Sequence, residues 1–343
     1  MYKPLLKKYA KLLIIIVLSG VGEWASAQDL HFSQFYNAPL NLSPALAGVF
    51  SGDQRFGANY RQQWSSVPVP YMTLSGYYDQ KIYLPQLRTG LLGGGVVFNY
   101  DRAGDGNLSW AQLGLNGAYV QQIAEKHYLS AGFEAMAGQR AFDPQKLYFD
   151  DQYNGDTFNP NQASDESFPR TSTTFIDLTA GLNWYFQNDE NRTRLYGGFS
   201  FAHLNQPKVG FFNDSSVKLP MQTRFYGMTV IHASEKWDAI FNGLWQIEGP
   251  SHEGIFGVGA RYHLLTTGGN DTALQLGISR RLEDAWVAHV ELFYGAWHAG
   301  LSYDINTSSF QTATNRNGGP ELSLRYIITK VKPPEAFKSC PVF

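Results

Sequence analysis

The chain has 343 residues, a formal net charge of −2 and only 16% charged residues, against about 25% in an ordinary water-soluble protein. The acidic balance argues against nucleic acid as a partner. The single cysteine, Cys340, excludes an internal disulfide and a zinc site built on several cysteines. Aromatic residues reach 15% and glycine occurs 34 times, which is typical of strands that alternate between lipid and a polar interior.

Residues 1–27 have the pattern of a secretory signal peptide. Four lysines precede the apolar run 12–21, and the small residues Ala25, Ser26 and Ala27 form a cleavage pattern before Gln28. The apolar run is shorter than the ~20 residues that a membrane-spanning helix needs, so a retained anchor is not expected. No other long apolar stretch follows, which argues against a helical membrane protein. The chain is therefore expected to be exported, and the mature chain is more acidic than the precursor.

After a polar and aromatic lead, residues 28–54, segments of alternating side chains recur as far as residue 329. Near the end, for example, Leu322, Leu324 and Tyr326 alternate with Ser323 and Arg325. A period of two predicts strands, and many of the segments have the 9–11 residues that cross a bilayer when tilted. The expected strands are 55–62, 71–82, 91–101, 109–123, 128–139, 172–187, 195–204, 225–234, 237–248, 254–264, 273–280, 286–294, 297–305 and 321–329.

These segments predict an all-β fold, a transmembrane antiparallel outer-membrane β-barrel of about 14 strands. The barrel should occupy residues 55–329, with a periplasmic lead at 28–54 and a periplasmic tail at 330–343. Polar residues on the minority face are interpreted as the lining of a polar lumen rather than as a buried active site. They include Glu134, Asp177, Asn183, Asn242, Glu291 and Arg325.

The lengths of the connections orient the barrel. Every second connection is tight or polar, as at 124–127 and 295–296, whereas the alternate set contains the long segments 140–171 and 205–224. The rule is imperfect, because 281–285 belongs to the second set and is short. Outer-membrane barrels have short periplasmic turns and long extracellular loops. Both termini are therefore expected in the periplasm and the long loops outside the cell.

Candidate binding residues lie in the long loops and in the lead. A loop of this length that is rich in aromatic side chains is typical of a contact surface. The outer candidates are Tyr148, Phe149, Asp150, Asp151, Phe211 and Phe212. The candidates in the lead are His31, Phe32 and Phe35, whose apolar rings need burial against a partner, as a plug of the barrel, or simply inside the lumen.

The sequence offers no support for an enzyme or a cofactor. The histidines are scattered over different segments, and no G-x-S-x-G nucleophile elbow is present. Gly93-Gly94-Gly95 lies inside an expected strand and lacks a following Gly-Lys-Ser/Thr, so it is not a phosphate-binding loop. Asp150, Asp151 and Asp156 could contact calcium, but their spacing lacks an EF-hand pattern and solvated loop carboxylates are the simpler interpretation. No catalytic residue, cofactor or metal site is therefore expected.

Several short motifs resemble the PorP/SprF family of type IX secretion membrane proteins from Bacteroidetes. The resemblance covers essentially the whole mature chain, although the tail has Val342 where the family's Cys-Pro-Arg-Phe ending has arginine. The motifs are Gln28-Asp29-Leu30-His31-Phe32-Ser33-Gln34-Phe35, Asn41-Leu42-Ser43-Pro44-Ala45-Leu46-Ala47-Gly48, Asn59-Tyr60-Arg61-Gln62-Gln63-Trp64, Phe142-Asp143-Pro144-Gln145-Lys146-Leu147 and His203-Leu204-Asn205-Gln206-Pro207.

The resemblance implies an outer-membrane component associated with type IX secretion and, in some members, with gliding motility. The partners that it implies are exported proteins with a C-terminal sorting domain, other secretion components and a periplasmic lipoprotein with a peptidoglycan-binding module. We expect the long loops to dock or anchor an exported surface protein. The alternative is a passive or substrate-specific pore, with which a polar lumen is equally consistent.

Overall fold

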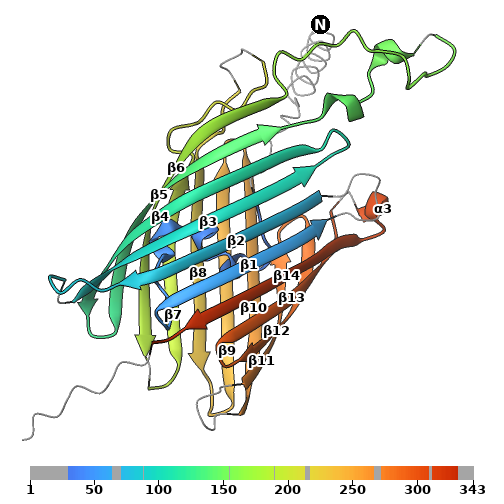
Figure 1. Ribbon diagram of the computed structural model, residues 1–343. Coiled ribbons are helices and arrows are strands. Elements are labelled where there is room, and N and C mark those ends of the chain that lie inside the picture. The colour runs from blue at the N-terminus through green and yellow to red at the C-terminus, as the bar shows by residue number, and fades with distance from the viewer. Residues whose placement is uncertain are drawn as a thin grey trace, which may run out of the picture.

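Fourteen strands, each hydrogen-bonded to its neighbours in chain order, close into one antiparallel barrel (Figure 1). The structure, a computed structural model, describes residues 30–63, 71–87, 89–153, 155–188, 190–212, 217–265, 272–308 and 311–330. The expected signal peptide and Cys340 lie outside these ranges. The strands are β1 (Gln54–Gln63), β2 (Tyr71–Ile82), β3 (Gly90–Ala103), β4 (Leu108–Ala124), β5 (His127–Ala141), β6 (Ser172–Asn188), β7 (Thr193–Ala202), β8 (Gln222–His232), β9 (Trp237–Glu248), β10 (Ser251–Leu265), β11 (Thr272–Arg281), β12 (Ala285–Tyr294), β13 (Trp297–Asn306) and β14 (Asn317–Ile328).

The predicted fold class is confirmed, and the alternation of side chains explains the wall. In β13, Leu301, Tyr303 and Ile305 are exposed on the outside, whereas Ser302 and Asp304 are buried inside. The outer residues suit lipid, and the closed sheet leaves no edge with unpaired backbone groups in the bilayer. Among the described residues, no helix is long and apolar enough to cross a membrane.

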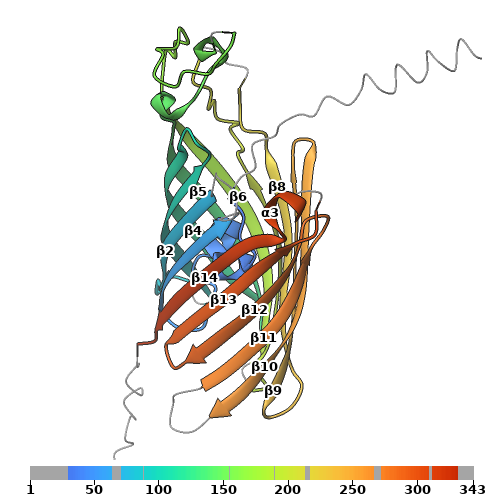
Figure 2. The ribbon, with the colours of Figure 1, turned by 90° about the vertical axis from the view of Figure 1, so that its right-hand side faces the viewer.

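The connections divide the barrel into two different ends. The short-turn end contains the turns after the even-numbered strands, including the two-residue turn at Gly295, whose φ of +55° favours glycine. The long-loop end contains the β5–β6 loop (142–171) and the β7–β8 loop (203–221), which project beyond the strands in Figure 2. The first contains the 3-10 helices η3 (Pro144–Lys146) and η4 (Asp150–Gln152), and the helix α3 (Gln311–Thr314) lies between β13 and β14.

The start of β14 differs from the expected strand, which began at residue 321. The strand begins at Asn317 because the segment Gly318-Gly319-Pro320 continues to pair with β13, with Asp304 opposite Gly319. The register shifts next to this pair, and Gly319 has a φ of +145° that other residues rarely adopt. Glycine and proline mark a loop in the sequence, but here they mark an irregular strand end.

Candidate functional site

Residues 30–53 fill the interior of the barrel, and we call this segment the plug. Figure 2 shows it in blue within the wall. Its rings Phe32 and Phe35, and Leu40, are at most 5% exposed. The segment expected as a periplasmic lead thus lies in the lumen, where its apolar side chains are removed from water. It contains three short helices, η1 (Phe35–Asn37), α2 (Pro39–Leu42) and η2 (Pro44–Leu46).

The plug crosses the lumen from one end to the other. Its first residues contact the long-loop end, where Arg61 Nη1 donates a hydrogen bond to the carbonyl of His31 at 3.0 Å. Its last residues contact the short-turn end, where Arg55 Nη2 donates to the carbonyl of Leu46 at 3.1 Å. The plug then continues directly into β1. Its start therefore lies near the long loops, although β1 itself begins at the opposite end.

Four buried charges, Arg61, Arg281, Asp304 and Glu321, surround Ser33 near the long-loop end, and we call them the clamp. Asp304 Oδ2 lies 2.7 Å from Arg61 Nη2 and 3.1 Å from Arg281 Nη1. The Ser33 hydroxyl donates to Asp304 Oδ1 at 2.7 Å, and the Ser33 backbone N–H donates to Glu321 Oε2 at 2.7 Å. Charge-assisted hydrogen bonds of this kind are short and strong. The clamp therefore fixes the start of the plug to four strands of the wall, β1, β11, β13 and β14.

A second ion pair fixes the end of the plug. Arg55 and Asp79 form a two-point contact with both N···O distances at 2.8 Å, and Asp79 Oδ2 also accepts from the backbone N–H of Gly48 at 2.8 Å. Between the two ends, wall side chains donate to plug carbonyls, as Ser130 does to Ala45 at 2.7 Å. Buried backbone groups outside regular structure need such partners. The wall supplies them along the length of the plug.

Wall glycines make room for the plug backbone. A Cβ added at Gly132 would lie 2.4 Å from the backbone nitrogen of Ala45, and one added at Gly93 would lie 2.0 Å from the carbonyl oxygen of Ala47. Gly48, which has a φ of +75°, faces Gly93 in the same contact. Strand glycines often mark a site where another backbone approaches closely. Here that backbone belongs to the plug.

Substitution of Gly132 by valine is expected to unseat the plug. The new side chain overlaps backbone atoms of Pro44 and Ala45, which cannot rotate away, and overpacking of this kind costs about 1–3 kcal/mol. Limited proteolysis should cut residues 30–53 faster in this variant. Gly117→Val is the matched control, because a Cβ at Gly117 meets nothing within 4 Å. Equal cleavage of the two variants would contradict the proposed fit.

The sequence candidates in the plug face the wall rather than open solvent. Phe32 and Phe35 are buried, and Phe35 belongs to a core cluster with Leu46 and Val120. Burial lowers the pKa of His31, and Arg61 and Arg281 lower it further against the opposing effect of Glu253. The imidazole is therefore neutral at neutral pH. Whether these three residues also bind a partner stays a prediction.

The two long loops pack against one another through phenylalanine rings. Phe142 contacts Phe168 edge-on at a centroid distance of 5.1 Å and contacts Phe211, from the other loop, at 4.6 Å. Phe168 also lies 5.8 Å from Phe149 and 6.1 Å from Phe212. We call these five residues the aromatic platform. The structure thus brings together three of the predicted loop residues, Phe149, Phe211 and Phe212.

Some rings of the loops remain on the surface. Tyr148 is 67% exposed and packs edge-on against Phe158, and Phe212 is 55% exposed. The predicted carboxylates behave differently from these rings, because Asp151 accepts hydrogen bonds from the Ser164 hydroxyl and the Asp165 backbone inside its own loop. Asp150 begins η4 and is exposed. The exposed rings are therefore the better candidates for contact with another protein.

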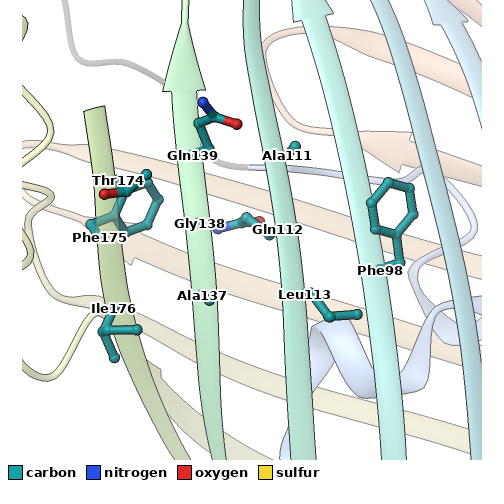
Figure 3. Close-up of a pocket in the computed structure, with 10 residues that line it drawn as sticks. All are labelled: Phe98, Ala111, Gln112, Leu113, Ala137, Gly138, Gln139, Thr174, Phe175 and Ile176. Atoms are coloured by element: carbon teal, nitrogen blue, oxygen red, sulfur yellow. The ribbon is translucent and has the colours of Figure 1, made fainter. Parts of the chain in front are cut away.

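A cavity of about 580 Å³ lies on the wall of strands β3 to β6 toward the long-loop end (Figure 3). Its lining combines the small residues Ala111 and Ala137 with the apolar Phe98, Leu113 and Ile176. The exposed apolar members of this lining lie on the lipid-facing side of the barrel, where a hollow accommodates acyl chains. In the part of the chain that the structure describes, no cluster of three or more His, Cys, Asp or Glu residues could bind a metal ion.

Sequence reasoning missed the clamp. It assigned residues of this kind to the lumen but could not pair them, because Arg61 and Asp304 are 243 residues apart. The pairing of the first strand with the last, which a closed barrel requires, could have revealed one of its contacts. Arg61 lies opposite Glu321 where the first strand pairs with the last. Opposite charges at matched positions of these two strands would have indicated an ion pair in the lumen.

Comparisons with known proteins identify the family of the chain. No curated protein matches the sequence. Among solved structures, the chain is similar to the CymD monoaromatic hydrocarbon channel at 9% identity, with 86% of this chain and 93% of that chain covered and a TM-score of 0.48. It is also similar to a Pseudomonas aeruginosa FadL homologue at 10% identity, with 83% and 92% covered and a TM-score of 0.45. Residues 25–326 match the type IX secretion system membrane protein family PorP/SprF. The chain therefore belongs to the PorP/SprF family of outer-membrane proteins of type IX secretion.

Proposed function

We propose that this protein is a closed outer-membrane anchor of the type IX secretion system, whose long loops dock an exported surface protein. Family membership supports the link to secretion, and the family is not a known enzyme family. The aromatic platform is the observation that carries the docking role. It joins the two long loops and leaves Tyr148 and Phe212 on the surface. Large exposed rings on an ordered support are typical anchors of protein interfaces.

The plug supports an anchor over a passive pore. Apolar side chains and buried ion pairs occupy the lumen from Ser33 to Gly48, and both ends of the plug are fixed to the wall. The plug therefore occupies space in the lumen that a passive pore would need to leave open. The proposal assigns no catalytic step to the barrel. The docked cargo is a protein with a C-terminal sorting domain. Secretion components, including a peptidoglycan-binding lipoprotein, bind at the periplasmic end.

Loss of the exposed rings is expected to weaken cargo docking. The double substitution Tyr148→Ser and Phe212→Ser removes two exposed rings but leaves Phe142, Phe168 and Phe211 to join the loops. Aromatic anchors at interfaces contribute about 2 kcal/mol or more each, so docking should fall by more than about tenfold. Surface labelling of intact cells and co-purification of exported proteins measure the loss.

The control for this variant is Tyr83→Ser, which removes a 52% exposed ring from the turn after β2 at the opposite end. It should leave cargo display unchanged. Deletion of residues 145–168 extends the test to the whole β5–β6 loop. Unchanged cargo display after this deletion, in a barrel that still migrates as a folded species, would show that the loop does not dock the cargo.

A further inference from the structure

A cavity of about 290 Å³ lies in the lumen at the short-turn end, between the plug and the wall. Its roof is the plug, through Tyr36, Leu46 and Val49, and its sides are inward-facing residues near the short-turn ends of the strands. We call it the short-turn cavity. Four arginines line it from four different strands: Arg55 on β1, Arg194 on β7, Arg261 on β10 and Arg325 on β14.

The carboxylates near this cavity are already occupied. Glu291 Oε1 accepts from the Tyr36 hydroxyl at 2.8 Å and from Gln275 Nε2 at 2.7 Å, and its Oε2 lies 2.6 Å from His298 Nε2. Asp79 is bound by Arg55 and by the plug backbone. Of the four arginines, only Arg55 therefore has a carboxylate partner at ion-pair distance among the described residues.

The remaining three arginines leave an excess of positive charge. Arg261 donates to Gln275 and lies 4.0 Å from the centroid of the Phe293 ring. Glu291 attracts it, whereas Arg325 and Arg194 repel it, so one carboxylate in the lining faces three arginines. Within the described part of the chain, the buried Nε atoms of Arg194 and Arg325 have no hydrogen-bond partner. A buried charge is normally paired, so two guanidinium groups without a carboxylate partner that line the same cavity form a candidate site for an anionic group. Guanidinium groups match carboxylates especially well, through two parallel hydrogen bonds.

We propose that the short-turn cavity binds an acidic peptide segment of a periplasmic partner, with its carboxylates on Arg194 and Arg325. The lining favours a peptide over a small inorganic anion, because Met228, Val230 and Ile240 add an apolar surface between the arginines. Next to the cavity, the rings of Tyr128, Tyr185 and Tyr196 stack in a row, at centroid distances of 4.6 and 5.8 Å. An extended segment that alternates acidic and apolar side chains complements both features. The site lies at the end opposite to the aromatic platform, so it is independent of cargo docking.

The test uses the full-length protein in detergent and two capped pentapeptides, one with alternating leucine and glutamate and one with glutamine in place of glutamate. Calorimetric titration should show binding of the acidic peptide and binding that is weaker by roughly tenfold or more for the neutral one, because glutamine cannot form charge-assisted hydrogen bonds with the arginines. Added salt should weaken the acidic peptide only. Equal binding of the two peptides, or no binding of either, would overturn the proposal without need of a variant.

Two further measurements locate the site and its ligand. Arg194→Gln combined with Arg325→Gln should reduce affinity for the acidic peptide by roughly tenfold or more. The control Arg102→Gln removes an exposed arginine at the long-loop end and should bind as the wild type does. Undiminished affinity in the double variant contradicts the assignment. Inorganic phosphate is the competitor: weak competition supports a peptide site, whereas phosphate binding as tight as that of the peptide means a small-anion site and rejects the peptide.

Discussion

Asp304→Asn is expected to release the start of the plug from the wall. Asp304 faces two arginines, Arg61 and Arg281, at 2.7 and 3.1 Å, and all three side chains are almost completely buried. Removing one partner of a buried ion pair costs about 3–5 kcal/mol, because the remaining charge loses its compensation. Here Arg61 loses its nearest carboxylate, and Arg281, which keeps Asp284 at 2.9 Å, loses the carboxylate that it shares with Arg61. The Ser33 hydroxyl is left with a neutral amide acceptor in place of a charged one.

The hydrogen-exchange rates of two backbone amides in the plug measure this release directly. The backbone N–H groups of Ser33 and Gln34 both donate to Glu321, at 2.7 and 2.8 Å, so they exchange only when the clamp opens. A loss of 3–5 kcal/mol corresponds to exchange that is faster by roughly 10² to 4 × 10³. Asp105→Asn is the control, since this carboxylate is exposed in the turn between β3 and β4. Protection of Ser33 and Gln34 that survives in Asp304→Asn would mean that the clamp does not hold the plug.

Much of the wall could be predicted from the sequence because lipid imposes a strict rule on each strand. The observed β12 and β13 begin and end within one residue of the expected segments 286–294 and 297–305. Their two-residue turn leaves no freedom in the connection. The start of β8 is less accurate, at residue 222 instead of 225, because the strand continues beyond the clear alternation to pair Gln222 with Glu248. Strand ends that lie outside the lipid do not need alternating apolar and polar side chains, so the sequence does not mark where they begin or end.

The interior could be predicted only in part. The need to bury Phe32 and Phe35 was visible, and packing inside the lumen was one of the outcomes considered. Which wall residues receive the plug was not visible, because the contacts join segments far apart in the sequence. Gly132 illustrates this limit, since its contact with Ala45 exists only after the barrel has closed and the plug has entered. The aromatic platform has the same origin, because Phe142 and Phe211 belong to different loops.

Removal of the plug is expected to turn the closed barrel into a conducting one. A chain that lacks residues 31–48 retains all fourteen strands, whose hydrogen bonds are made within the wall. The polar side chains that now contact the plug, such as Asp79 and Asn99, would face water instead. In planar bilayers the wild type should show no steady current and the deletion variant a steady open channel. The loop deletion of residues 145–168 is the control, because it leaves the plug in place and should remain closed.

The outcome of this experiment separates the lumen from the loops. If the plug serves to seal the barrel, cells with the deletion variant should leak small solutes and still display the exported cargo. Among the described residues, the ring contacts of the aromatic platform join the two long loops and do not involve residues 31–48. A wild-type barrel that conducts steadily would instead favour the pore. If the deletion variant also loses cargo display, the plug takes part in docking. Its first residues lie beside the long loops, close enough for such a contact. The clamp substitution distinguishes these two roles, since it frees the start of the plug while the contacts of Asp79 with Gly48 keep the short-turn end closed.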